Sequence, residues 1–174
     1  MHPTVCRLIE HYELRPLPVE GTLFVGTYRS AAELADGSPV GTAMIGLYCH
    51  QPRSFSSFHR LPADEVWHFY DGDPLRLVLL APDGSSRDVL LGRDVAAGQV
   101  VQLVVPAGTW QAGHVVDDGT YTLFGCTMAP GFTSRGFEGA VTADLLRRYP
   151  DRAADIERLR SPDDAARMAP DFAT

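Results

Sequence analysis

The sequence contains no lysine, because all 15 of its basic residues are arginine, and its formal net charge is −7. A protein that binds nucleic acid needs a concentration of positive charge to neutralise phosphates, which this acidic chain does not offer. Without lysine, a Schiff base between a substrate and a lysine amine is also excluded. Nucleic acid is therefore not an expected partner.

Cysteine and long apolar runs are also scarce. The three cysteines, Cys6, Cys49 and Cys126, are too few and too irregularly spaced for a disulfide framework or a paired metal-binding motif. No stretch reaches the 18 apolar residues that a membrane-spanning helix needs, and the first residues are polar where a secretion signal would be basic and then apolar. We expect a reduced, cytoplasmic protein that does not enter a membrane.

What the sequence does contain is an ordinary globular composition, with 45% hydrophobic and 21% charged residues in 174. A chain of this length buries about 70% of its unfolded surface in one core. Residues 1–174 are therefore predicted to form a single domain. Its central part, about 18–130, carries the predicted core, and helices are expected at about 138–160, followed by a frayed tail at 161–174.

The central part reads as an all-β protein. Short runs of β-branched and aromatic residues recur at roughly ten-residue spacing, separated by turn residues such as Asp71-Gly72 and Pro82-Asp83-Gly84. This spacing is typical of a β-sandwich or a small barrel. Apolar residues at helical spacing predict a short N-terminal helix within 4–14, and Pro150 is expected to begin a second helix near the C-terminus.

Several segments in order resemble one known family. They are FHRLPADEVWHFYDG (58–72), PDG (82–84), PAGTWQAG (106–113) and FGCTMAPGF (124–132), followed by a Tyr-Pro pair and a closing helix. Together they resemble the cupin superfamily, in particular its cupin-5 or DUF985 branch. The resemblance implies a double-stranded β-helix, or jelly roll, with an internal ligand cavity and a homodimer that packs sheet against sheet.

In the general cupin pattern, four side chains hold a metal: two histidines spaced HxH, a glutamate, and a third histidine from a second motif. His59 and Glu65 occupy the first histidine and the glutamate positions in this sequence. Leu61 stands at the second histidine position, and Gln111 replaces the third. Two of the four ligands are present, so His59, Glu65 and Gln111 are the residues that would hold a divalent metal if one were bound.

Strand geometry predicts which side chains share the cavity, because residues two apart point to the same face. If His59 points inward, Ser57 and Leu61 should follow, and Trp67 and Phe69 should line the next strand with Glu65. By the same alternation, His68 and His114 should point away from the ligand, and Trp110 should serve packing or the dimer interface.

Three interpretations of these residues stay open. An amide is a weak ligand beside imidazole and carboxylate, so a metal site is the less favoured one. A desolvated Glu65 beside His59 suits proton transfer next to a carbonyl, with Gln111 donating a hydrogen bond to the oxygen that becomes negative. In the third, His59 and Glu65 only satisfy each other's buried polarity.

The N-terminal part of the match adds two residues. Arg29 ends the first strand motif, where it would either bind a carboxylate or phosphate of the ligand or anchor the dimer through an acidic neighbour. Thr22 lies in PVEGT, where the family tends to have paired glycines, and this segment crosses the cavity mouth in the implied fold.

We therefore expect an isomerase, epimerase or lyase that uses His59, Glu65 and Gln111 on a small oxygenated metabolite, without a cofactor, in a bacterial biosynthetic pathway. The alternatives are a ligand-binding cupin without chemistry and a metal-dependent cupin oxygenase.

Overall fold

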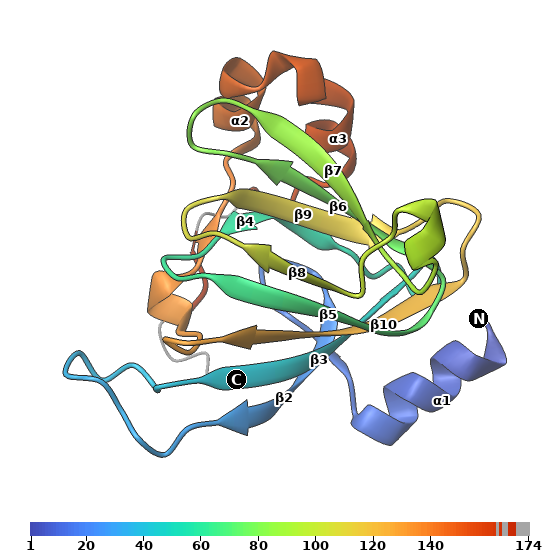
Figure 1. Ribbon diagram of the computed structural model, residues 1–174, viewed down its shortest axis with the longest axis horizontal. Helices are drawn as coiled ribbons and strands as arrows, with labels where there is room; N and C mark the ends of the chain where they lie inside the picture. Colours follow the sequence, from blue (N-terminus) through green and yellow to red (C-terminus); the bar gives the residue numbers. More distant parts are fainter. Residues whose placement is uncertain (163, 165–166, 170–174) are drawn as a thin grey trace.

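The short β-rich runs between Gly, Pro and Asp turns form two antiparallel sheets in the computed structural model, which describes residues 1–162, 164 and 167–169 (Figure 1). One sheet has six strands in the order β1 (Arg15–Pro16), β2 (Leu23–Arg29), β3 (Thr42–Cys49), β10 (Tyr121–Met128), β5 (Glu65–Gly72) and β8 (Gln102–Val105). The other has five, in the order β11 (Glu138–Gly139), β4 (Ser56–Arg60), β9 (Trp110–Val115), β6 (Leu75–Leu80) and β7 (Ser86–Leu91). These counts refer to the described residues.

The interior between the sheets is filled by alternate residues of the strands. On β6, Leu75, Leu77 and Leu79 face inward, where they meet the inward side chains of β5 and β10. The intervening residues of β6, Val78 and Leu80, face the opposite side of the sheet and belong to a separate cluster. This alternation, with both faces of one strand covered, explains the nearly continuous apolar run LRLVLL.

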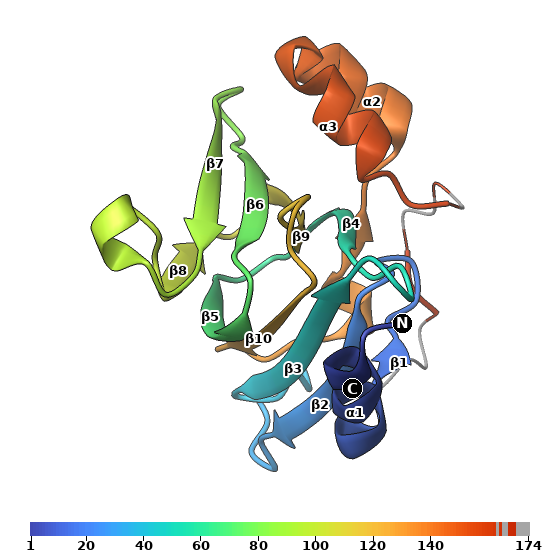
Figure 2. The same ribbon diagram turned by 90° about the vertical axis from the view of Figure 1, so that its right-hand side faces the viewer.

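Helices cover the outer faces of both sheets. Helix α1 (Pro3–Tyr12) packs through Val5 on the six-stranded sheet, and its N-terminus is capped by His2. Helices α2 (Thr142–Arg148) and α3 (Ala153–Arg158) pack on the five-stranded sheet. Figure 2 shows α1 beside β2 and β3, and the C-terminal helices beyond β4. Three single 3₁₀ turns complete the elements: η1 (Val95–Ala97), η2 (Ser134–Gly136) and η3 (Pro150–Arg152).

The predicted fold is confirmed: it is an all-β jelly roll with short helices near both ends. Pro150 begins η3, which leads into α3, as expected from its position. Of the tail expected to fray, residues 163, 165–166 and 170–174 lie outside the described residues, whereas Ser161 and Met168 are buried. None of the described helices has the length and apolar content needed to span a bilayer.

Candidate functional site

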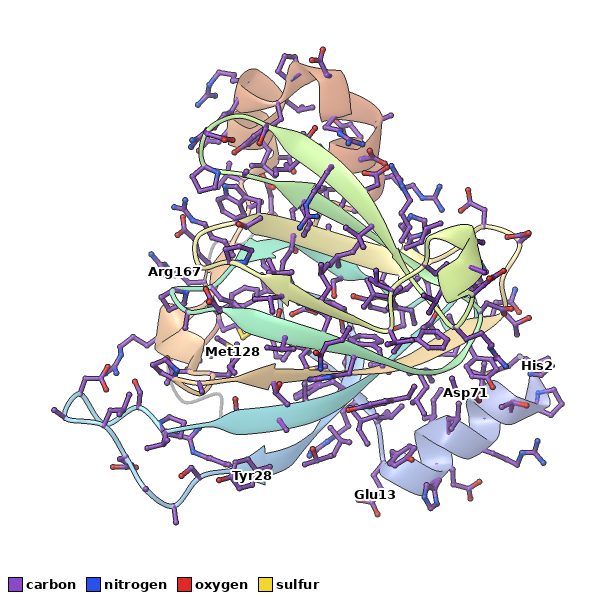
Figure 3. The ribbon with its side chains drawn as sticks, in the orientation of Figure 1. His2, Glu13, Tyr28, Asp71, Met128 and Arg167 are labelled. Atoms are coloured by element: carbon purple, nitrogen blue, oxygen red, sulfur yellow. The ribbon has the colours of Figure 1, made fainter. Side chains whose placement is uncertain are left out.

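A pocket opens at the end of the barrel where β5 begins and β10 ends. Met128, labelled in Figure 3, marks this end. The pocket volume of about 40 Å³ has room for a few waters, since one water needs roughly 10–15 Å³. Its polar wall consists of Glu20, His59, Glu65, Thr42 and Cys126. The remaining wall is apolar: Leu17, Phe24, Ala43, Met44, Leu61, Met128, Phe132 and Phe137.

His59 is fixed at one wall of this pocket. Its Nδ1 lies 2.9 Å from the carbonyl oxygen of Ser57, and because a carbonyl only accepts, Nδ1 carries a proton and donates it. The ring stacks on Phe137, with a centroid distance of 5.3 Å. Its other nitrogen, Nε2, faces Glu20 Oε2 at 3.8 Å. The imidazole is therefore oriented by backbone and ring contacts, with Nε2 left for chemistry.

Glu20 is a buried carboxylate held by hydroxyl groups. Its Oε1 accepts hydrogen bonds from Thr22 Oγ1 and from Ser56 Oγ, the latter at 2.6 Å. The Tyr48 hydroxyl in turn bonds to Ser56 Oγ, and burial raises the pKa of Tyr48 well above its ordinary value. Tyr48 therefore keeps its proton and donates. This chain of hydroxyls orients Glu20 so that Oε2 points toward His59.

Glu65 lies in a different environment. Its Oε2 accepts hydrogen bonds from Trp67 Nε1 at 3.0 Å and from Gln111 Nε2 at 2.7 Å, and Trp67 Nε1 also reaches Gln111 Oε1 at 3.0 Å. Burial raises the pKa of Glu65 above its ordinary value, while the charge of His59 opposes this rise and the charge of Glu20 adds to it. Glu65 therefore keeps its proton to a higher pH than an exposed glutamate does.

Cys126 is the neighbouring thiol in the pocket wall. Its pKa is raised well above its ordinary value, first by burial and then by the charges of Glu65 and Glu20. A thiol in these surroundings stays protonated and is a poor nucleophile. Cys126 therefore contributes a neutral wall rather than covalent catalysis.

Ser57, His59 and Leu61 were all predicted to point inward from β4 and the residue that follows it. His59 and Leu61 do line the pocket, whereas Ser57 does not. Ser56 pairs with Gly113 and His59 with Gln111, so β4 has one more residue than β9 between these pairs. This bulge shifts the alternation by one position, because an extra residue reverses the facing of those before it. Ser56 takes the inward place, and Ser57 lines a separate cleft.

The two aromatic residues predicted to contact a ligand from the next strand, β5, do not border the pocket. Trp67 and Phe69 belong to the packed interior and do not line the pocket. The Trp67 ring stacks on Phe124 at 4.9 Å, so only its Nε1 reaches toward the site. Gln111 likewise does not line the pocket, because both ends of its amide are bonded to Trp67 and Glu65. Gln111 Nε2 thus contacts Glu65 and does not border the pocket.

Three further predicted residues lie outside the pocket. Arg29 is exposed, and its Nη1 donates to the carbonyl oxygen of Phe132 at 3.4 Å. His68 bonds to Thr127 Oγ1 on the outer side of its sheet. His114 is buried on the outer side of the five-stranded sheet, where burial lowers its pKa. Neither histidine lines the pocket, as the alternation predicted. Trp110 packs against the C-terminal helices.

Glu20 is the site residue that the sequence analysis missed. It lies in the turn before β2, where Val19 and Gly21 both have positive φ, 68° and 94°. The signal was present in PVEGT, since this segment was expected to cross the cavity mouth. A carboxylate in such a turn is ordinary on a surface, and only the fold brings it within reach of a histidine 39 positions later in the chain.

The residues present do not fit the metal of the general cupin pattern. Leu61 has no donor atom, and the Gln111 oxygen is already bonded to Trp67. In the described part of the chain, no group of three or more His, Cys, Asp or Glu side chains is arranged to hold a metal ion. His59, Glu20 and Glu65 are of ligand types, but they are not arranged as a metal-binding group.

Comparison with known proteins identifies the family. Residues 6–140 match the family described as the cupin superfamily (DUF985). The chain belongs to this family. A hypothetical protein from Leishmania major is 30% identical to this cupin, with a TM-score of 0.79 over 88% of this chain and 96% of the other. A protein from Shewanella oneidensis is 34% identical, with a TM-score of 0.81 over 89% and 96% of the two chains.

More distant structures share the fold alone. A cupin 2 domain-containing protein from Halorhodospira halophila is 13% identical, with a TM-score of 0.51 over 79% of this cupin and 81% of the other chain. No curated protein sequence matches this cupin. Because jelly rolls carry many unrelated activities, the function of this cupin has to be argued from its pocket.

Proposed function

We propose that this cupin catalyses proton transfer at a carbon atom of a small oxygenated metabolite, as an epimerase, isomerase or lyase that needs no metal. The observation that carries this proposal is one histidine set between two buried carboxylates in unlike environments. In such a site, a buried carboxyl whose pKa is raised suits the role of acid, and the neighbouring imidazole suits that of base. We place the reaction in the cytoplasm and in a biosynthetic pathway, as expected from the sequence.

In this mechanism, His59 Nε2 removes a proton from the carbon next to a carbonyl, and the electron pair of that C–H bond moves into the carbonyl to form an enolate. Protonated Glu65 donates to the enolate oxygen, which limits the negative charge that develops. The Glu20 carboxylate at 3.8 Å stabilises the imidazolium formed on His59. Return of a proton to the opposite face of the same carbon gives an epimer. Where that carbon carries a hydroxyl group, protonation of the former carbonyl carbon, with loss of the hydroxyl proton, gives an isomer.

The pocket wall indicates what kind of substrate fits. The Glu20 carboxylate in a small, largely apolar cavity repels an anionic group, because charges interact strongly where water is excluded. A neutral hydroxyl or carbonyl group between apolar side chains matches the wall better. We therefore expect the reacting end of the substrate to be a neutral hydroxy-carbonyl group, admitted by movement of flexible side chains such as Met44 and Met128.

Hydrogen exchange with solvent tests this proposal without knowing the product. Neutral hydroxy-ketones and hydroxy-aldehydes, beginning with dihydroxyacetone and glyceraldehyde, would be incubated with the protein in D₂O, and loss of the C–H signal followed by proton NMR. We expect wild-type protein to catalyse exchange in at least one compound. His59→Gln should slow it by at least about 100-fold, the usual contribution of a general base.

Matched variants separate chemistry from binding. His68→Gln, a histidine on the outer side of the same barrel, should leave exchange unchanged. A compound that binds and is recovered without exchange would support the alternative of a ligand-binding cupin. That alternative is favoured by one observation: Glu65 Oε2 accepts hydrogen bonds from both Trp67 and Gln111, which also suits a purely structural carboxyl.

We also propose that this cupin is a homodimer that packs through its six-stranded sheet. Beyond α1, the outer face of this sheet carries partly exposed apolar side chains, including Val104 and Tyr70, which are 49% and 51% exposed. Exposed apolar side chains on one face of a sheet are consistent with an interface. Val104→Arg should shift the mass measured by light scattering from dimer to monomer. A wild-type monomer would contradict the proposal.

A further inference from the structure

A second cavity lies on the other side of the segment that carries Glu20. This cleft has a volume of about 650 Å³, far larger than the 40 Å³ pocket. It lies between the start of β4, the turn that precedes it, and the end of α3. The side chains that matter for its chemistry are Arg53, Ser57, Glu157, Arg158 and Arg160.

Three arginines, Arg53, Arg158 and Arg160, line the cleft in an otherwise acidic protein. Arg53 is held in place, since its guanidinium lies 4.4 Å above the Phe55 ring and its Nη2 donates to the carbonyl oxygen of Arg158. A guanidinium has five N–H donors, so most of those on Arg53 remain free. Arg158 is paired with Asp117, whereas Arg160 forms no ion pair with a described residue. Two carboxylates, Glu157 and Glu20, also line the cleft, and Glu20 accepts hydrogen bonds from Thr22 and Ser56.

A buried hydroxyl without a partner lines the same cleft. Ser57 is 2% exposed, and its Oγ has no hydrogen-bond partner among the described residues. A buried polar group without a partner costs free energy, and such groups are rare in folded proteins. Ser57 reached this position through the bulge in β4, which turned it away from the His59 pocket. The hydroxyl and the arginines therefore line one cavity from different segments.

We propose that this cleft binds the phosphate or carboxylate group of a small molecule. Arg53 and Arg160 would supply charge-assisted hydrogen bonds, and Ser57 Oγ would donate the bond it otherwise lacks. The size of the cleft is that of a small-ligand site. This site is separate from the His59 pocket and does not depend on the chemistry proposed there.

The two cavities meet at Glu20. Its side chain lines both of them, and its carbonyl oxygen accepts a hydrogen bond from the Ser57 backbone N–H at 2.9 Å. An anion bound to Ser57 therefore lies one hydrogen bond away from the segment that orients Glu20 toward His59. The Ser57 amide is a direct reporter of binding.

An NMR titration tests the site, with inorganic phosphate and malonate as separate probes at constant ionic strength. We expect the Ser57 amide resonance to shift along a saturable curve with at least one probe. Saturation with phosphate alone assigns the site to phosphoryl groups, and saturation with malonate alone assigns it to carboxylates. Ser57→Ala should weaken binding about tenfold, the loss of one hydrogen bond to a charged group, read from the neighbouring Phe58 amide.

The arginines are tested with a control of equal charge. Arg53→Ala with Arg160→Ala should weaken binding more than tenfold, whereas Arg87→Ala with Arg147→Ala, two exposed arginines elsewhere, should change it less than twofold. Arg160→Ala alone provides a second test if the double variant is unstable. The proposal is wrong if neither anion saturates, if Ser57→Ala binds like wild type, or if both double variants lose affinity equally.

Discussion

The two ends of the barrel interior are built from the same strands and differ in what fills them. Toward one end, Trp67 and Phe124 stack on each other, and Tyr48 packs against Phe124 at 4.4 Å. Toward the other, β5 begins with Glu65 and β10 ends with Met128, and the space between them is a pocket. Figure 1 shows both strands running the full length of the sheet between these ends.

Along each strand, the residues that stabilise the fold by packing therefore lie apart from the residues proposed to carry the chemistry. The packed end buries large apolar side chains without leaving space, which is where burial contributes most to folding. The pocket end buries four titratable groups, Glu20, His59, Glu65 and Cys126, which costs free energy unless their hydrogen bonds are satisfied. Trp67 joins the two ends, because its ring belongs to the packed end and its Nε1 bonds to Glu65.

The largest expected effect is the loss of an aromatic ring from the packed end. Phe124→Ala should lower the free energy of unfolding by about 4 kcal/mol, because it leaves a large cavity among buried side chains. Met128→Ala at the pocket end should cost about 2 kcal/mol, since this side chain already borders open space. Urea unfolding measures both. Equal losses would contradict the division between the two ends.

A smaller effect of opposite sign is expected at Glu65. Its pKa is raised in the folded protein, so the folded state binds more protons than the unfolded state above the ordinary value near 4.5. Its carboxylate therefore lowers stability as pH rises from about 4.5 through the folded pKa. Glu65→Gln keeps an oxygen for Trp67 and Gln111 and removes this cost. We therefore expect Glu65→Gln to raise the urea midpoint of unfolding at pH 8.

The pH dependence provides the control for this second prediction. The gain from Glu65→Gln should shrink as the pH falls and vanish below about 4.5, where the wild-type carboxyl becomes protonated in both states. Glu10→Gln on the exposed side of α1 should change stability little at any pH. If Glu65→Gln lowered stability at pH 8, Glu65 would be held as a charged group, and its proposed role as the acid would be wrong.

Much of the fold followed from the sequence, because strand alternation and turn residues are local signals. Leu75, Leu77 and Leu79 lie inward as period-two alternation requires, and Pro150 begins a helical turn. The site was predictable where alternation is unbroken, at His59 and Leu61. The prediction failed at Ser57, because a bulge adds one residue to β4 and no feature of the sequence SSFHR indicates this bulge.

The remaining errors concern contacts between distant segments. Glu20 reaches His59 only because the turn before β2 folds across the barrel mouth. Gln111 was expected to face the ligand, but its amide is bonded to Trp67 and Glu65, and only the folded arrangement reveals this. The face of a strand on which a residue lies can be predicted from alternation, but the hydrogen-bond partners of its side chain cannot.

The central claim is that His59 and Glu65 are proton-transfer groups rather than the remains of a metal site. Elemental analysis of the protein purified without chelator, comparing wild type with His59→Ala, tests it most directly. We predict far less than one metal ion per chain in both proteins. One equivalent of iron, nickel or zinc in wild type that disappears in His59→Ala would contradict the claim and favour the metal-dependent alternative.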